Sequence, residues 1–273
     1  MSRGFRGAEA DKPGFDASAF WARGGACHAF TRPGQQPTSP RPAFGDHSGS
    51  MALAFGISAA LYRRAVTGEP TVVENSLLST AVWMLSSDVT YSQMPGYDTH
   101  GMGAVKQPLK YAYTTKDGRI IQFMLLDPRP HWGPLCRMLG LDGFENDPRF
   151  VDNEARMKNA DELIGAIQGV IGAKDWEEWR PVFDQWDAPW ELIRTIEDLS
   201  EDPQVLANGM VFNMAVNGGE IRMVAGPTGF DGRAAPETSR PAPALGAHTE
   251  ELLVELGYSP AVIADLRERK VAE

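Results

Sequence analysis

Small and hydrophobic residues form their longest continuous run between Met51 and Ala65. Prolines at positions 33, 37, 40 and 42 precede this run and favour a loop. Arg63 and Arg64 lie near the end of this run and Gly68 follows it, an arrangement typical of a helix C-terminus. The pattern therefore predicts a loop that leads into a helix over residues 48–65. The density of Gly, Ala and Ser in this helix indicates close packing in a buried core.

The spacing of apolar residues marks two further helices in the second half of the chain. The stretch 154–171 carries its aliphatic residues at positions that form one stripe on a helix. Asp175 is the expected N-cap of a helix rich in aromatic residues. The apolar residues of this helix are Trp176, Trp179, Val182, Phe183 and Trp186. Aromatic residues at helical spacing either line a pocket or form core, and the pattern favours core.

Two β-hairpins are indicated by turn residues between β-prone runs. In the first, Lys116-Asp117-Gly118 separates residues 111–115 from residues 119–124. In the second, Asn217-Gly218-Gly219 separates residues 213–216 from residues 220–224. Shorter helices are expected over 17–22, 76–87, 132–139, 249–256 and 260–270, a β-prone piece over 71–74, and a capping box at Thr195 and Asp198. This order of elements predicts an α/β fold, without the regular alternation of a complete doubly wound sheet.

Composition narrows the classes of function. The chain has 273 residues, 42% of them hydrophobic and 23% charged, which is the balance of a soluble globular protein. A net charge of −10 argues against a nucleic-acid surface, and no apolar run reaches the roughly 18 residues of a membrane span. The two cysteines, Cys27 and Cys136, lie far apart, so a reduced, cytoplasmic chain is expected. No cluster of residues has the spacing of a metal site, and no dinucleotide or Walker loop is present.

Asp46 is the candidate for chemistry, because it stands where the predicted loop meets the predicted helix. Unpaired N–H groups and the helix dipole favour an anion there. Local sequence alone favours an N-cap role, since Asp is a preferred capping residue. Gly45 and Gly49 remove side chains beside the carboxylate, and this indicates that another group needs the room. A cap and a catalytic nucleophile are compatible roles.

Motifs in consistent order along the chain resemble the class III CoA-transferases, also called the CaiB/BaiF family. The matching pieces are Pro13-Gly14-Phe15-Asp16 with residues 20–25, Gly45-Asp46-His47-Ser48-Gly49-Ser50, residues 56–62 with Thr67-Gly68, Ser76-Leu77-Leu78, residues 113–119, Asp147-Pro148-Arg149-Phe150, Asp202-Pro203-Gln204-Val205, and residues 245–253 with Leu256-Gly257-Tyr258. The resemblance implies that Asp46 is the catalytic nucleophile.

The resemblance also implies a fold: part of a large, Rossmann-like α/β domain with a small α+β domain inserted in it. The expected parts are the nucleophile-bearing part of the large domain with a linker (1–107), the small domain (108–190) and a return to the large domain (191–273). Family members form interlocked homodimers. They normally begin with a parallel α/β segment that holds much of the CoA surface, and no such segment is found in this sequence. We therefore expect a homodimer or a partner chain, and weak CoA binding by this chain alone.

The predicted function is a CoA-transferase that acts on an acyl-CoA and a carboxylic acid. Asp46 attacks the thioester to give a mixed anhydride and then an aspartyl-CoA thioester. Backbone N–H groups near Gly45, Ser48 and Gly49 are expected to stabilise the oxyanions, and His47 either orients substrate or is an exposed polar neighbour. No tightly bound cofactor and no metal are expected, since CoA enters as part of the substrate. A missing glycine-rich loop disfavours formate or oxalate as substrate.

Two alternatives belong to other classes. An α-methylacyl-CoA racemase of the same superfamily pairs the aspartate with a histidine that follows the glycine of the first motif. Here Phe15 follows Gly14, and phenylalanine carries no proton, so the racemase ranks below the transferase. A non-catalytic fragment or subunit that assembles with a partner chain is the third interpretation.

Overall fold

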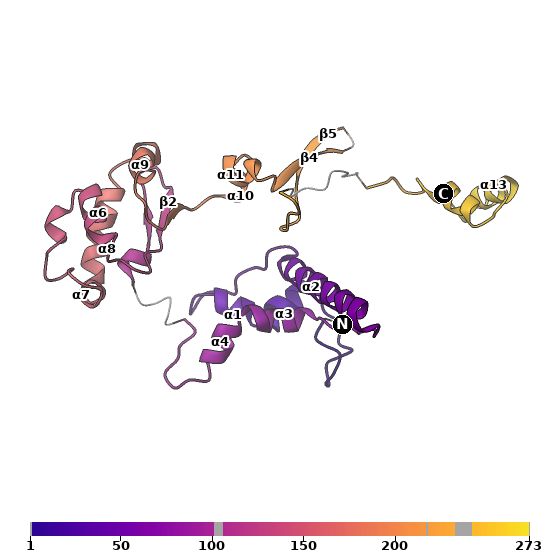
Figure 1. The fold of residues 1–273 in the computed structure, drawn as a ribbon, viewed down its shortest axis with the longest axis horizontal. Helices are drawn as coiled ribbons and strands as arrows, with labels where there is room; N and C mark the ends of the chain where they lie inside the picture. The colour runs from indigo at the N-terminus through magenta and orange to yellow at the C-terminus, as the bar shows by residue number, and fades with distance from the viewer. Residues whose placement is uncertain (1, 101–105, 217, 233–241, 273) are drawn as a thin grey trace. The chain divides into compact units, whose positions relative to one another are not determined.

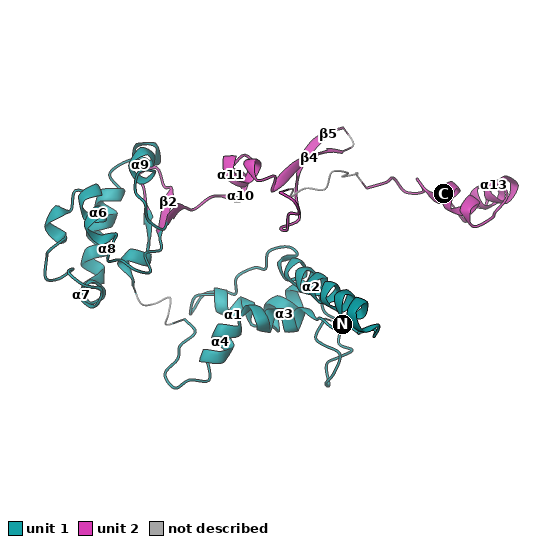
Figure 2. Ribbon diagram, in the orientation of Figure 1, with its two compact units in different colours: residues 1–113, 123–189 teal, residues 114–122, 190–273 magenta. Residues whose placement is uncertain are grey.

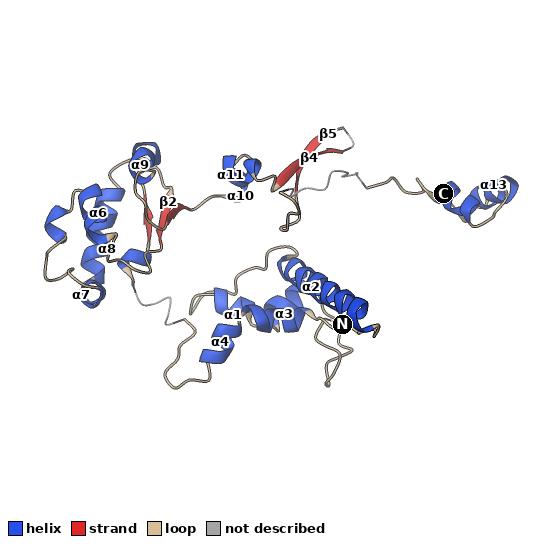
Figure 3. Ribbon diagram, viewed as in Figure 1, coloured by secondary structure: helices blue, strands red, loops and turns tan. Residues whose placement is uncertain are grey.

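The computed structural model describes residues 2–100, 106–216, 218–232 and 242–272. The chain divides into two compact units, residues 1–113 with 123–189 and residues 114–122 with 190–273 (Figure 2). The expected turn residue Asn217 and parts of the expected linker and Pro-rich loop lie outside the described residues. Helices predominate, with short strands between them (Figure 3).

The N-terminal part of unit 1 is helical. Its elements are η1 (Asp16–Ala22), α1 (Ala26–Phe30), α2 (Phe44–Thr67), α3 (Leu77–Met84) and α4 (Ser86–Tyr91) (Figure 1). A small core of Phe20, Trp21, Ala26 and Ala81 joins η1, α1 and α3, with Leu77 and Leu85 packed against it. The predicted β-prone piece over residues 71–74 forms no strand. The helix predicted over 76–87 is two helices, which meet at Leu85.

Helix α2 differs from its prediction in two ways. It begins at Phe44, four residues before the predicted start at position 48, so Asp46 lies inside its first turn. Gly45 is its buried residue, whereas Phe55, Tyr62 and Val66 are 77%, 74% and 68% exposed. The expectation of a buried helix is therefore wrong for this chain. Its apolar residues surround the helix on all sides, and a helix packed along one face leaves the others exposed.

The second part of unit 1 has an aromatic core. Its helical elements are η2 (Pro108–Lys110), α6 (Trp132–Met138), η3 (Asp142–Phe144), α7 (Asn153–Lys158), α8 (Ala160–Ile171) and α9 (Trp176–Phe183). Trp176, Trp179, Phe183 and Trp186 are buried, so the predicted core role of these aromatics is confirmed. Asp175 and Glu178 form a capping box that starts α9, as the N-cap prediction required. The helix predicted over 154–171 is split at Asn159.

Both predicted hairpins are present. The first gives β1 (Ala112–Thr114) and β2 (Ile120–Phe123), which form a three-stranded sheet of order β1-β2-β3 with β3 (Trp190–Leu192). The second gives β4 (Val211–Val216) and β5 (Gly219–Val224), an antiparallel pair with Val211 opposite Val224. Unit 2 also contains the helices α10 (Ile196–Leu199), α11 (Pro203–Ala207), α12 (Thr249–Glu255) and α13 (Pro260–Glu268). The predicted capping box of Thr195 and Asp198 starts α10.

Within the described ranges, no helix is long and apolar enough to cross a membrane. The predicted division at residues 107 and 190 remains a prediction, and the two compact units are divided at other residues along the first hairpin.

Candidate active site

The site is built where α2 begins, and its first turn is held from outside the helix. The N-cap residue is Ala43, which has φ 56° and provides no side-chain cap. The carboxylate of Asp16, the first residue of η1, instead accepts the N–H of Gly45 at 3.0 and 3.2 Å. The interpretation of Asp46 as an N-cap is therefore wrong. Asp16 satisfies a helix-terminal N–H group from a position 29 residues earlier.

Gly45 is required by close packing against η1. A Cβ atom at this position would lie 2.4 Å from both Cγ of Phe20 and Oδ1 of Asp16. The room beside Asp46 at this glycine is thus already filled by the protein. Gly49 is different, because a Cβ there would meet its nearest atoms, in Thr80 and Leu77, at 3.7 and 3.8 Å. A Cβ at Gly49 would make ordinary van der Waals contacts, so this glycine, unlike Gly45, is not required by close packing.

The Asp46 side chain is exposed and lies at the third position of α2. Its carboxylate forms no hydrogen bond or ion pair with any residue that the structure describes. It lines a depression of about 400 Å³ between α2 and the start of α3. The depression is lined by Ser2, Asp46, Gly49, Ser50, Leu53, Asn75, Ser76 and Leu77. A carboxylate that does not cap its helix is available to a ligand in this depression.

The other predicted site residues surround Asp46 but differ in what they offer. His47 is exposed, and its backbone N–H donates to the Ala43 carbonyl at 2.8 Å. The hydroxyl of Ser48 donates back to the Phe44 carbonyl at 2.8 Å. The N–H of Gly45 is taken by Asp16. Among the described residues, the backbone N–H of Asp46 has no acceptor. This N–H group can therefore donate a hydrogen bond to an oxyanion.

Two residues of the site were missed by sequence reasoning, Asp16 and Asn75. The side chain of Asn75 donates to the Gly49 carbonyl at 3.0 Å, and its oxygen lies 3.0 Å from the Thr80 hydroxyl. Asp16 belongs to the first matched motif, and this membership was a signal that the residue matters. Nothing in the sequence indicated that its partner is Gly45. Asn75 immediately precedes the Ser-Leu-Leu motif and carried no signal of its own.

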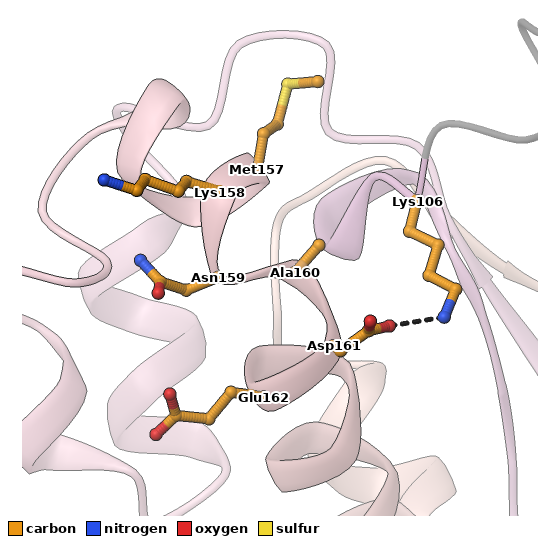
Figure 4. A pocket seen from close by; sticks show the side chains of 7 residues that line it. All are labelled: Lys106, Met157, Lys158, Asn159, Ala160, Asp161 and Glu162. Atoms are coloured by element: carbon orange, nitrogen blue, oxygen red, sulfur yellow. Dashed lines mark hydrogen bonds and ion pairs between the residues drawn. The ribbon is translucent and has the colours of Figure 1, made fainter.

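Other reactive groups of the chain lie in less suitable surroundings. Burial raises the pKa of the Cys136 thiol to about 12, so this cysteine is no thiolate nucleophile near neutral pH. A second hollow lies at the junction of α7 and α8 (Figure 4). Of the four charged side chains drawn there, Lys106 and Asp161 pair with each other. In the described part of the chain, no group of three His, Cys, Asp or Glu residues is placed to hold a metal ion.

Comparisons with known proteins place this chain in a family. The model of CoA-transferase family III matches residues 2–249. The (R)-2-hydroxy-4-methylpentanoate CoA-transferase of Clostridioides difficile is 31% identical over 272 residues, which cover 99% of this chain and 68% of that protein. The cinnamoyl-CoA:phenyllactate CoA-transferase of Clostridium sporogenes is 30% identical, over 98% of this chain and 66% of that protein.

Solved structures share the fold. A CAIB/BAIF family protein from Brucella suis matches with a TM-score of 0.75 at 22% identity, over 94% of this chain and 66% of that chain. A Mycobacterium tuberculosis protein matches with a TM-score of 0.75 at 21% identity, over 90% of this chain and 65% of that chain. The α/β fold of this family, predicted from the motifs, is confirmed. The chain spans about two thirds of the length of these relatives.

Proposed function

Because this chain belongs to CoA-transferase family III, as its motifs predicted, we propose that it takes part in moving CoA between an acyl-CoA and a carboxylic acid. One observation supports Asp46 as the nucleophile more than any other. Its carboxylate lies in the first turn of α2, exposed beside a depression. The hydrogen bond to the N–H of Gly45 comes from Asp16, so the Asp46 carboxylate is not engaged in capping the helix. A carboxylate in the first turn of a helix interacts favourably with the helix dipole.

In the proposed reaction, an oxygen of Asp46 attacks the thioester carbonyl. The C–S bond breaks, CoA leaves as the thiolate, and a mixed anhydride of Asp46 and the acyl group remains. The thiolate then attacks the Asp46 carbonyl carbon, which releases the first carboxylate and forms an aspartyl-CoA thioester. The incoming carboxylate repeats these steps in reverse order and leaves as the new acyl-CoA. The unpartnered N–H of Asp46 is a candidate donor to the negative oxygens that form in these steps.

The proposed substrates are acids with an apolar side chain. The depression beside Asp46 is bordered by two leucines, Leu53 from α2 and Leu77 from α3. Two relatives are named for 2-hydroxy-4-methylpentanoate and for cinnamoyl-CoA with phenyllactate, all of which carry branched or aromatic hydrocarbon groups. Leucine side chains suit such groups better than they suit a small dicarboxylate.

The racemase alternative ranks lower for the reason that the sequence suggested. Phe15 occupies the place of the second proton carrier, and this residue is 82% exposed. Washing of deuterium into the α-carbon of an acyl-CoA, without acyl exchange, would favour the racemase instead.

A homodimer, or a partner chain, is the proposed assembly. It is supported by the exposed apolar residues of α2, since an uncovered surface of this kind marks interaction sites. No tightly bound cofactor is proposed, because CoA is exchanged as substrate.

The test of the proposed function is transfer of CoA to an isotope-labelled 2-hydroxy acid, followed by chromatography of the labelled thioester. Asp46→Asn should lower this rate by at least about 10³-fold, as the loss of a nucleophile does. Asp11→Asn, an exposed acid outside the depression, is the matched control and should retain the rate. Circular dichroism should report the same fold for both variants. Full activity of folded Asp46→Asn would dismiss Asp46 as the nucleophile.

A further inference from the structure

Asn75 connects the two walls of the depression that Asp46 lines. It immediately precedes Ser76, the N-cap of α3, and its side chain is half-buried. Its Nδ2 donates to the carbonyl of Gly49, which lies three residues beyond Asp46 in α2. One turn of an α-helix spans 3.6 residues, so Asn75 contacts the turn that carries the carboxylate.

The orientation of the Asn75 amide follows from the chemistry of its neighbours. The Gly49 carbonyl only accepts hydrogen bonds, so the nitrogen must face it. The oxygen of the amide faces two hydroxyls, Thr80 at 3.0 Å and Ser79 at 3.4 Å, and each of these also lies 2.9 Å from the Ser76 carbonyl, so its one proton is shared between two acceptors. Thr80 is 4% exposed, which fixes one end of this link in the protein interior. The link therefore runs from a buried residue of α3 through Asn75 to the backbone of α2.

Phe44, the first residue of α2, also packs its ring 5.6 Å from that of Trp21 and 6.2 Å from that of Phe20. Gly45 is the buried residue of α2, whereas Phe55, Tyr62 and Val66 further along the helix are exposed. Asp16 holds the backbone just before Asp46, and Asn75 holds it three residues after. The two contacts are on opposite sides of the candidate nucleophile along the chain.

We propose that Asn75 is a positioning residue, which holds the Asp46 turn of α2 at a fixed place against α3. This proposal rests on the proposed function of Asp46. Asn75 acts through the Gly49 backbone, so its loss displaces the nucleophile without removing a group that binds substrate. A displacement of about 1 Å can cost about 10²-fold in rate.

The kinetic test compares Asn75→Ala with wild type. Gln93→Ala is the control, because the Gln93 amide donates a hydrogen bond to the Val89 carbonyl, away from the depression. Asn75→Ala should lower kcat by about 10- to 100-fold and leave KM within about threefold.

Thr80→Val should also lower kcat, but by a smaller factor than Asn75→Ala. Thr80→Ser keeps the hydroxyl and should recover most of that loss. The double variant Asn75→Ala/Thr80→Val should be no slower than Asn75→Ala, because both changes break one link. The proposal would be overturned if Asn75→Ala kept the kcat of wild type, or if its KM rose by as large a factor as its kcat fell. It would also be overturned if the loss in the double variant equalled the combined losses of the two single variants.

Hydrogen exchange of the backbone amides gives a second readout that needs no activity. Asn75→Ala should speed exchange of the amides at residues 46–53 and leave those of α9 unchanged. If Asp46→Asn retains full transfer activity, or wild type has none, the proposed function fails and exchange alone decides whether Asn75 holds this turn. Unchanged exchange in residues 46–53 would overturn the role of Asn75 in either case.

Discussion

At the scale of single residues, the start of α2 depends on a contact that leaves no space for a side chain. Phe20 and Asp16 occupy the volume where a Cβ of residue 45 would lie. Asp16 also supplies the hydrogen bonds that the Ala43 N-cap does not. A motif glycine and a motif aspartate therefore act as one unit, which places the backbone immediately before Asp46.

The two glycines beside Asp46 should respond in opposite ways to the same change. Gly45→Ala should lower the free energy of unfolding by about 1–3 kcal/mol, because its Cβ clashes with the Phe20 ring. Gly49→Ala should leave it unchanged or raise it by up to about 1 kcal/mol, because alanine favours the helix and the Cβ has room. Urea unfolding followed by circular dichroism measures both. Equal effects of the two substitutions would contradict this packing account.

The residue scale also shows where prediction from sequence ends. Asp46 was correctly located near a helix start, because the loop formers and the apolar run both indicate one. Its capping role was wrong, because the group that bonds to the helix terminus comes from Asp16, distant in sequence. The partnership of Asn75 with Gly49 is equally a tertiary contact, and no local pattern encodes it.

At the scale of elements, turn and capping patterns predict the structure correctly where the interacting residues are close in sequence. The hairpin around Asp117-Gly118 and the capping boxes that start α9 and α10 involve residues within a few positions of each other. In the box of α10, hydrogen bonds from Thr195 and the nearby charge of Arg119 lower the pKa of Asp198. The predicted ends of α2, α3 and α7 differ from the observed ends, because contacts with other elements and the cap geometry determine where these helices begin and end.

The aromatic core that α9 contributes should carry much of the stability of its part of the chain. Phe183 is 0% exposed, and its ring lies 5.7 Å from that of Trp179 and 6.0 Å from that of Phe123. Phe183→Ala should lower the free energy of unfolding by about 3–5 kcal/mol, because it leaves a cavity among these rings. Phe230→Ala, at a residue 76% exposed, is the control and should change it by less than about 1 kcal/mol. Similar losses in both variants would argue against this core.

At the scale of the whole molecule, motif order along the chain identified the family although each motif alone is short. The matched family model spans residues 2–249, and the chain spans about two thirds of the length of its relatives. The exposure of α2 was not predictable, because a run of apolar residues shows that a helix needs cover without showing what supplies it.

The exposed residues of α2 should make this chain self-associate. Sedimentation velocity should find a dimer or a larger species, since uncovered apolar surface favours association. Phe55→Glu with Tyr62→Glu, which puts charge at two residues 77% and 74% exposed, should shift the population toward monomer. Leu126→Glu, at a residue 73% exposed outside α2, should not. A monomeric wild-type chain at all concentrations would contradict the proposed assembly.

Chemical trapping tests most directly whether Asp46 becomes covalently attached to CoA during transfer. The chain is incubated with an apolar 2-hydroxyacyl-CoA, treated with borohydride, digested and analysed by peptide mass spectrometry. Borohydride reduces an aspartyl thioester to the alcohol, so the account predicts conversion of the Asp46 side chain to a primary alcohol only when acyl-CoA is present. Transfer of CoA with Asp46 unmodified, or with the alcohol found at another acidic residue, would contradict it.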